Sequence, residues 1–489
     1  MNVEQPQEIS IGAALAREAA RQPHTIAVQC EGDTRTWREL HKRTNRIARG
    51  LAAKGVTFGD FLTVALPNGV GFIEACYAAW KLGAVPQPVS FRLPKGELRA
   101  IAELAQTPVV VGDADTMDAG KPVVSIAQLY AASNDDSDLE DKIAPAWKAP
   151  TSGGSTGRPK LIVAGQPGLA SPTAAEFWRI SPDDILLMPA PLYHNGPIVT
   201  VFPALQVGAR VIIMPRFDAE KTLQMIEQYR ATWVYLVPTM MGRIWRLPEE
   251  VRKKYDLSSL RTVWHLAAPC PAWLKEEWIN WLGAKKIWEL YGGTEGQART
   301  TLDGEEWLKH RGSVGRVHES GEIRIFDGEG RELPPGETGE VYMRRAAIVP
   351  ETYRYIGAEA RKIHDGWESL GDMGWFDEDG YLYLADRRSD MILVGGANVY
   401  PAEIEAALEE HPMVQSCAVI GLPDDDLGNR IHAVVQRRGE VNESELLTHL
   451  ADRLVTYKRP RSIEFVTEAL RDDAGKIRRS ALRAERIQK

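Results

Sequence analysis

Helix-like and strand-like segments alternate over two long stretches of this sequence, and this alternation limits the folds open to the chain. Between residues 9 and 130, amphipathic segments such as "TWRELHKRTNRIARGLAAKG" alternate with short apolar runs such as "FLTVALP". The same alternation returns from Asp184 to Pro269. Strands that alternate with helices are typical of βαβ units, in which helices cover a largely parallel sheet. The sequence therefore predicts an α/β fold for both stretches.

The pattern changes after about residue 315, where short strands separated by Gly and Pro turns predominate. Beyond the charged segment "DRRSD" (386–390), the sequence has the pattern of an α+β module with a helix at "PAEIEAALEEH" and a strand at "SCAVIGL". We therefore expect a large N-terminal domain over residues 1–388, with mainly parallel sheets layered with helices plus a β-rich subdomain. A small α+β domain is expected over residues 389–489.

The stretch "APTSGGSTGRPKLIV" (149–163) has the residue types of a phosphate-binding loop. Glycines allow backbone N–H groups to converge on an anion, hydroxyls donate hydrogen bonds, and a lysine adds a positive charge. These residues are Ser152, Gly153, Gly154, Ser155, Thr156, Gly157 and Lys160. A Walker A loop is excluded because its first glycine would fall on Ser152, and because a strand follows Pro159 where a helix is required. The remaining alternative is a solvated turn.

Four further stretches carry polar groups suited to a nucleotide. Glu295, beside the glycines of "ELYGGTEGQ", could hold Mg²⁺ against phosphate oxygens. Asp372 in "LGDMGW" could accept hydrogen bonds from both hydroxyls of a ribose. Arg387 lies at the expected domain junction, and Lys476 lies on a loop near the C-terminus. Taken singly, Asp372, Arg387 and Lys476 are better explained as a turn or solvated charges, and a surface turn is the alternative for the Glu295 stretch.

Charge, hydropathy and cysteine content narrow the class of partner. A net charge of −8 argues against a nucleic-acid partner that requires phosphate neutralisation. No apolar run approaches the roughly 18 residues of a membrane-spanning helix, and "MNVEQPQEIS" lacks the features of a signal peptide. The four cysteines are far apart and form no metal-type pair. We therefore expect a cytoplasmic protein without a membrane span or a nucleic-acid partner.

Taken in order, "SGGSTGRPK", "YGGTEG", "GD", "DRRSDMI" and "GK" resemble the core motifs of the adenylate-forming superfamily. That superfamily includes acyl-CoA synthetases, amino-acid-activating domains and beetle luciferases. The resemblance covers nearly the whole chain and is nearest to an acid–CoA ligase branch that includes bile-acid and steroid-acid ligases. It implies that ATP and Mg²⁺ activate a carboxylic acid as an acyl-adenylate with release of pyrophosphate. A nucleophile, usually the thiol of CoA, then displaces AMP.

The resemblance also implies roles for individual residues. Lys160 would close the phosphate loop, Glu295 would be the carboxylate for Mg²⁺, and Lys476 would bridge the acid and the α-phosphate in the first half-reaction only. The small domain would then rotate about Ser389. The implied ATP site also takes in segments that hold the adenine and the ribose, which are Ala267, Ala268, Pro269, Tyr291, Gly292, Gly293, Thr294, Asp372 and Arg387. The implied acid pocket consists of His194, Trp233, Tyr235, Leu266 and Gly292.

Three positions depart from the common pattern of the superfamily. Gly153 replaces a hydroxyl residue, which leaves the geometry of the phosphate loop open. Leu266 stands where many acyl-CoA synthetases have glycine, and Ser389 replaces the usual acidic residue or lysine at the hinge. None of the three removes a charge that adenylation requires. His194 is also compatible with simple core packing, as are Trp233 and Tyr235.

The acid and the acceptor remain open at this stage. Tyr193, His194 and Asn195 offer no carboxylate for an α-ammonium group, and no carrier domain follows, so amino acids are disfavoured. A wall of Trp, Tyr and Leu suits an aryl or other bulky apolar acid. Because the first half-reaction is shared, an amide synthetase that passes the acyl group to a free amine is the alternative to a CoA ligase. A catalytically silent nucleotide-binding protein is a third hypothesis, which the presence of Glu295 and Lys476 disfavours.

Overall fold

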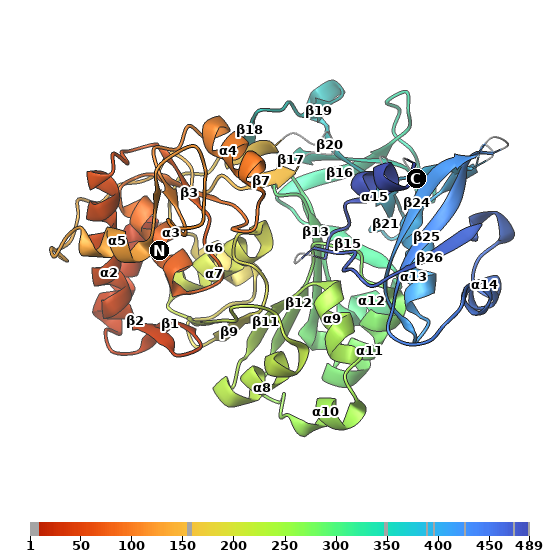
Figure 1. Cartoon of the computed structure of the whole chain (residues 1–489), viewed down its shortest axis with the longest axis horizontal. Coiled ribbons are helices and arrows are strands. Elements are labelled where there is room, and N and C mark those ends of the chain that lie inside the picture. Colours follow the sequence, from red (N-terminus) through yellow and green to blue (C-terminus); the bar gives the residue numbers. More distant parts are fainter. Residues whose placement is uncertain are drawn as a thin grey trace, which may run out of the picture.

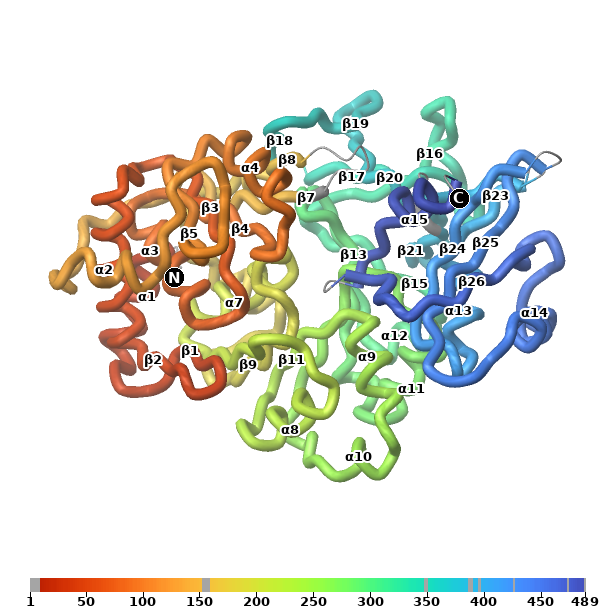
Figure 2. The backbone as a smooth tube through the Cα atoms, in the orientation of Figure 1, coloured from red at the N-terminus to blue at the C-terminus, as the bar shows by residue number. Residues whose placement is uncertain are grey.

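The chain is described by a computed structural model that covers residues 9–153, 159–346, 351–387, 390–394, 397–424, 427–472 and 475–487. Figure 1 shows an N-terminal part on the left, a central part that carries α8 to α11, and the C-terminal segment on the right. The same order is visible along the backbone trace in Figure 2. The expectation of a large α/β portion followed by a small α+β portion is confirmed.

Among the described residues, fourteen strands form one mixed sheet that crosses the large domain. Its middle, from β1 through β10, β9, β11 and β12 to β13, is parallel, and the pairs from β13 to β16 are antiparallel. In spatial order the strands are β16 (Gly321–Phe326), β17 (Gly339–Arg345), β20 (Glu368–Phe376), β21 (Tyr381–Arg387), β15 (Ser313–Val317), β14 (Arg299–Asp303), β13 (Ile287–Gly292), β12 (Thr262–His265), β11 (Trp233–Leu236), β9 (Ile185–Met188), β10 (Arg210–Ile213), β1 (Ile26–Cys30) and β2 (Asp33–Thr36), with β19 (Arg361–Lys362) beside β20.

Two smaller sheets complete the strands of the large domain. A parallel sheet has the order β4 (Val85–Pro88), β3 (Phe61–Val64), β5 (Val110–Val111) and β6 (Val123–Val124). An antiparallel sheet joins β18 (Tyr353–Ile356), β8 (Pro159–Ala164) and β7 (Thr151–Gly153). The second sheet brings the two ends of the predicted phosphate loop beside a strand that lies about two hundred residues further along the chain.

Helices cover these sheets, and some of their boundaries follow local capping signals. Thr36 caps α2 and forms a reciprocal capping box with Glu39, while Gly55 beyond the helix end has a φ of 89°. The helices of the large domain are α1 (Ile11–Arg21), α2 (Trp37–Ala53), α3 (Val70–Lys81), α4 (Lys95–Leu104), α5 (Ile126–Ala131), α6 (Pro172–Phe177), α7 (Asn195–Val207), α8 (Ala219–Tyr229), α9 (Pro238–Trp245), α10 (Glu249–Lys254), α11 (Ala272–Leu282) and α12 (Gly304–Lys309), with short 3₁₀ turns η1 (Ala284–Lys286) and η2 (His364–Gly366).

The small domain has its own apolar core, made of buried side chains between Ile392 and Leu454 that form a cluster separate from the core of the large domain. Asn442 and Glu445 form a reciprocal capping box at the start of its second helix. The elements are β22 (Ile392–Val394), β23 (Ala397–Val399), α13 (Pro401–Glu409), β24 (Val414–Asp424), β25 (Gly428–Arg437), α14 (Glu443–Ala451), η3 (Thr456–Lys458), β26 (Ser462–Val466) and α15 (Arg479–Ile487). The boundary at residue 388/389 remains a prediction, because Ser389 lies outside the described residues.

Candidate active site

The predicted phosphate loop connects two paired strands. β7 and β8 are antiparallel, with Ser152 opposite Lys160 and Gly153 opposite Pro159. The residues between them, Gly154, Ser155, Thr156 and Gly157 of the prediction among them, lie outside the described residues. The strand that follows the loop confirms that it is not the strand-to-helix connection of a Walker A motif.

Glu295 is buried next to this hairpin. It follows the end of β13, is 7% exposed, and accepts a hydrogen bond of 2.5 Å from the Tyr355 hydroxyl on Oε1. The Lys160 ammonium lies 3.8 Å from the same oxygen and 3.9 Å from the centre of the Tyr355 ring. Burial, and then the charge of Glu295, raise the pKa of the Tyr355 hydroxyl above its ordinary value. The hydroxyl therefore stays a neutral donor that holds the carboxylate in place.

The second carboxylate oxygen of Glu295 lies close to Gly293. A Cβ atom at Gly293 would lie 2.8 Å from Glu295 Oε2 and 2.3 Å from Leu370 Cδ1, so a larger residue there would have to displace these two side chains. Among the described residues, no group of three or more His, Cys, Asp or Glu side chains could hold a metal ion. One carboxylate suits Mg²⁺ that arrives with a nucleotide, because this ion keeps waters and phosphate oxygens as its other ligands. Glu295 therefore fits the predicted role.

Lys148 is a charged residue of this region that the sequence did not single out. Its side chain is 6% exposed, and its ammonium donates a hydrogen bond of 2.5 Å to Asn195 Oδ1 at the first turn of α7. Burial lowers the pKa of Lys148 to about 8, and the charge of Glu295 opposes this shift. A lysine inside the otherwise apolar run "APAWKAP" was the available signal. This region therefore contains a buried cation, Lys148, in addition to the half-buried Lys160.

The ribose side of the predicted site is assembled by strand pairing. The Tyr291 hydroxyl at the end of β13 donates a hydrogen bond of 2.7 Å to Asp372 Oδ2 on β20. Asp372 is opposite Arg387 in the pairing of β20 with β21. Three predicted residues that lie far apart in the sequence are thus neighbours in one sheet.

The predicted adenine segment follows β12. Leu266 is buried, whereas Ala267 is exposed and has a φ of 79°, a left-handed conformation that is uncommon for a residue with a side chain. Ala268 and Pro269 continue at the surface, where they line a pocket between the two domains. The segment therefore presents backbone rather than bulky side chains.

A buried ion pair that the sequence analysis missed lies where this segment begins. Lys275 on α11 is 1% exposed, and its ammonium donates a hydrogen bond of 2.5 Å to Glu289 Oε2 on β13. The fully buried ring of His265, which precedes Leu266, lies 3.9 Å from the same oxygen. Burial and the charge of Lys275 lower the pKa of His265 well below its ordinary value, so the imidazole is neutral. This pair ties α11 to the sheet directly behind the adenine segment.

Two of the predicted acid-pocket residues meet at α7. His194 is the N-cap residue of this helix, and its ring centre lies 4.6 Å from that of Tyr193. The Tyr235 hydroxyl lies against Gly196, since a Cβ atom at Gly196 would be 2.3 Å from the Tyr235 oxygen.

Two further predicted pocket residues are closely packed. A Cβ atom at Gly292 would lie 3.2 Å from Arg299 Cβ. Trp233 is fully buried and donates its indole N–H to the Trp178 carbonyl at 2.8 Å. Its place in the pocket stays a prediction.

The loop that carries Lys476 reaches the large domain. Backbone and side-chain hydrogen bonds of 2.9 Å join Asp472 and Lys476 across this turn. Gly475, with a φ of 77°, is buried against α9, because a Cβ atom there would lie 2.8 Å from Thr239 Oγ1. The neighbouring residue Lys476 is therefore held at the boundary between the two domains.

A fold with a large α/β domain, a buried carboxylate beside a glycine-rich hairpin and a lysine loop from a small domain defines a nucleotide-dependent enzyme of the adenylate-forming type. The family model for the AMP-binding enzyme matches residues 15–353, and that for the AMP-binding enzyme C-terminal domain matches residues 403–476. The chain belongs to the AMP-binding enzyme family.

Proteins with named activities are similar to this chain over nearly its whole length. A feruloyl-CoA synthase of an Amycolatopsis species is 34% identical, over 97% of this chain and 98% of its own length. The o-succinylbenzoate CoA synthetase of Bacillus subtilis, solved with its acyl-adenylate, superposes with a TM-score of 0.83 at 27% identity, over 97% of this chain and 98% of that one. The amide bond synthetase McbA from Marinactinospora thermotolerans gives a TM-score of 0.80 at 25% identity, over 97% and 99% of the two chains. Within the described residues, no helix is long and apolar enough to cross a membrane.

Proposed function

We propose that this enzyme activates an aryl carboxylic acid with MgATP and transfers the acyl group to the thiol of CoA. The observation that carries the proposal is the buried Glu295 carboxylate, which lies beside Lys160 and the β7–β8 hairpin while the Lys476 loop approaches from the small domain. The relatives that act on feruloyl and succinylbenzoate groups support an aryl acid. The four cysteines form no disulfide, which supports the reducing cytoplasm as the location.

In the first half-reaction, the carboxylate of the acid attacks the α-phosphorus of ATP, the bond to the pyrophosphate oxygen breaks, and an acyl-adenylate forms. Lys160 would neutralise charge on the phosphates, and Lys476 would bridge the acid and the α-phosphate. Mg²⁺, held by Glu295, would supply charge stabilisation of the phosphate oxygens. Tyr291, Asp372 and Arg387 would hold the ribose and position the nucleotide.

In the second half-reaction, the sulfur of CoA attacks the acyl carbon and AMP leaves, so that a thioester replaces the mixed anhydride. Lys476 would leave the site when the small domain rotates about Ser389. His194 at the start of α7, and Tyr235 on β11, would line the acid pocket together with Leu266.

The alternative acceptor is a free amine, which would give an amide in place of the thioester. The likeness to the amide bond synthetase McbA favours keeping this candidate, because that protein has the same fold over nearly its full length. The two functions differ only in the group that attacks the acyl-adenylate.

A panel experiment tests the proposal. Pyrophosphate release is measured with ATP, Mg²⁺ and ferulic, succinylbenzoic, fatty and steroid acids, each with CoA, with a simple amine, and with neither, and products are identified by mass. We expect an acyl-CoA from an aryl acid. Lys476→Ala should lose pyrophosphate release while still transferring the acyl group from a supplied acyl-adenylate. An amide formed without CoA would assign the second function, and no pyrophosphate with any acid would contradict the first half-reaction.

A further inference from the structure

Two arginines connect the domains in a reciprocal manner. Arg246, which follows α9 in the large domain, donates a hydrogen bond of 3.2 Å to the backbone carbonyl of Glu409, the last residue of α13 in the small domain. Arg438, after β25 of the small domain, donates one of 2.7 Å to the backbone carbonyl of Arg246. Each guanidinium thus meets the carbonyl end of a helix in the other domain. Cations are favoured there, because the last carbonyls of a helix lack partners and carry partial negative charge.

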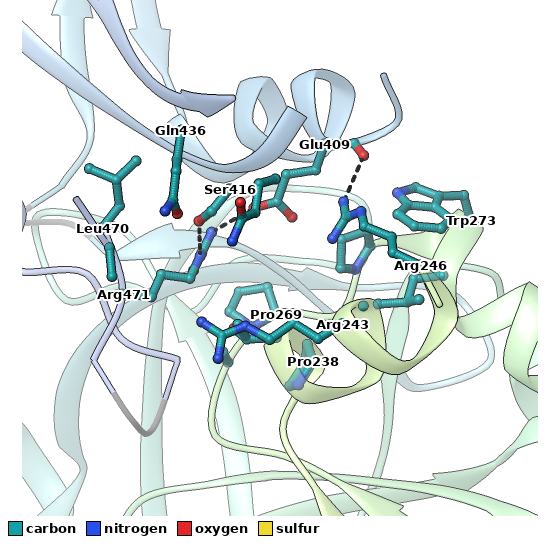
Figure 3. Close-up of a pocket in the computed structure, with 17 residues that line it drawn as sticks. Pro238, Arg243, Arg246, Pro269, Trp273, Glu409, Ser416, Gln436, Leu470 and Arg471 are labelled. Atoms are coloured by element: carbon teal, nitrogen blue, oxygen red, sulfur yellow. Dashed lines mark hydrogen bonds and ion pairs between the residues drawn. The ribbon is translucent and has the colours of Figure 1, made fainter. Parts of the chain in front are cut away.

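The contact continues inside the small domain to the lysine loop. Glu409 Oε1 accepts a hydrogen bond of 3.1 Å from Arg471 (Figure 3). Arg471 in turn donates one of 3.2 Å to the backbone carbonyl of Gly475. Burial lowers the pKa of Arg471, but the charges of Glu409 and Glu405 outweigh it, so the guanidinium is firmly charged. Gly475 is seated on Thr239 at the first turn of α9. The small domain therefore contacts both ends of α9, through Gly475 at the first turn and through Arg438 at the last.

The surroundings of Arg246 fix its orientation. Its guanidinium lies 5.7 Å from the Trp273 ring centre, in the pocket that both domains line. The backbone carbonyls of Arg246 and Glu409 can accept these particular donors only while α9 and α13 are end to end. Rotation of the small domain must break both hydrogen bonds together with the contact between Gly475 and Thr239.

We propose that Arg246 and Arg438 are positioning residues for the first half-reaction, which select the domain orientation that delivers Lys476 to the large domain. The inference rests on the proposed function for its catalytic meaning. Neither arginine touches the nucleotide in this scheme. They act through Glu409, Arg471 and Gly475, and their contacts belong to one orientation only. Loss of either contact should slow adenylate formation and leave the transfer from a preformed acyl-adenylate unchanged or faster.

The test measures both half-reactions for Arg438→Ala and Arg246→Gln. We expect the single-turnover rate of pyrophosphate release to fall roughly five- to thirtyfold, in the lower part of the about 5- to 150-fold range typical of coupling free energies. Acyl transfer from supplied acyl-adenylate should not fall, and Arg438→Lys should recover part of the loss. The matched control is Arg453→Ala, which removes an exposed arginine that pairs with Glu410 inside the small domain. A merely structural role would lower both half-reactions and the melting temperature together, and that result would overturn the proposal.

A second measurement needs no activity. Amide hydrogen exchange should quicken in peptides that cover residues 237–246 and 475–477 of Arg438→Ala, but not of Arg453→Ala. Unchanged exchange would overturn the inference even where Lys476→Ala abolishes adenylation, and the proposed function would then stand alone. Quicker exchange in an enzyme that adenylates no acid would support the contact and contradict the function.

Discussion

Two buried lysines, Lys81 and Lys148, have different hydrogen-bond partners, and burial lowers the pKa of both, to about 7 for Lys81 and to about 8 for Lys148. Lys81 donates hydrogen bonds to three acceptors, two on His41 and one on Asn45. Lys148 makes its hydrogen bond to a single amide, that of Asn195, at the N-terminal end of a helix where positive charge is already concentrated. A buried ammonium whose pKa is lowered by desolvation is unfavourable for folding while it is charged, and such a group commonly marks a functional site.

The pH dependence of stability should reveal the burial of Lys148. Below pH 8 its amine is charged in both the folded and the unfolded chain, and folding bears the full desolvation cost. Between pH 8 and the ordinary lysine pKa of 10.5, the unfolded chain retains a proton that the folded chain releases, so stability rises with pH. We therefore expect the stability advantage of Lys148→Met over the natural protein to shrink by about 3 kcal/mol between pH 7 and pH 10.5.

Urea unfolding of both proteins at several pH values measures this difference. Lys142→Met, which removes a more exposed lysine nearby, should show no such trend. Parallel stability curves for Lys148→Met and the natural protein would mean that the folded amine titrates as it does in water.

At the scale of elements, the Lys275–Glu289 pair couples α11 to β13 behind the adenine segment. Lys275→Met should destabilise the large domain by about 3–5 kcal/mol, because it leaves a buried carboxylate without its counter-charge. The double variant Lys275→Met/Glu289→Leu should recover most of that loss, since no buried charge remains. Denaturant unfolding of the single and double variants provides the check. If the two substitutions were additive, the pair would not interact in the way the 2.5 Å contact indicates.

Local elements were predictable from the sequence where the signal was itself local. The capping boxes at Thr36 and Asn442 involve residues three positions apart, and the structure has both. The short strands separated by Gly and Pro turns that the sequence predicted after about residue 315 are present as antiparallel pairs, although antiparallel pairing already begins between β13 and β14.

The candidate site was predictable only as far as its motifs extend. The motif residues Tyr291 and Asp372 do meet, but nothing local indicated the buried position of Lys148 or its contact with Asn195. Arg246 and Glu409 are 163 residues apart in the sequence. Because every residue has a backbone carbonyl, the type of the accepting residue gives no sign of such a hydrogen bond. Contacts of this kind depend on how whole domains pack, so sequence patterns could not reveal them.

At the scale of the molecule, the proposed cycle requires that the chain turn near Ser389. Ser389→Pro should preserve pyrophosphate release and slow acyl transfer from supplied acyl-adenylate by tenfold or more, about 1.4 kcal/mol in the barrier, because proline fixes φ near −65°. Ser389→Ala is the control, since alanine keeps the rotational freedom of the backbone. Rapid transfer in the proline variant, measured by stopped flow, would place the pivot elsewhere.

The reciprocal arginines at the ends of α9 and α13 have a consequence for how readily the domains separate. The two hydrogen bonds join guanidinium groups to carbonyl oxygens, and water can replace either partner as soon as the helices move apart. An apolar interface would instead expose hydrophobic surface to water each time the domains separate, and this cost would oppose their separation. In the proposed cycle, a contact made of such exchangeable polar groups would hold the small domain in one orientation without making its release slow, so that closing and opening could both occur within one turnover.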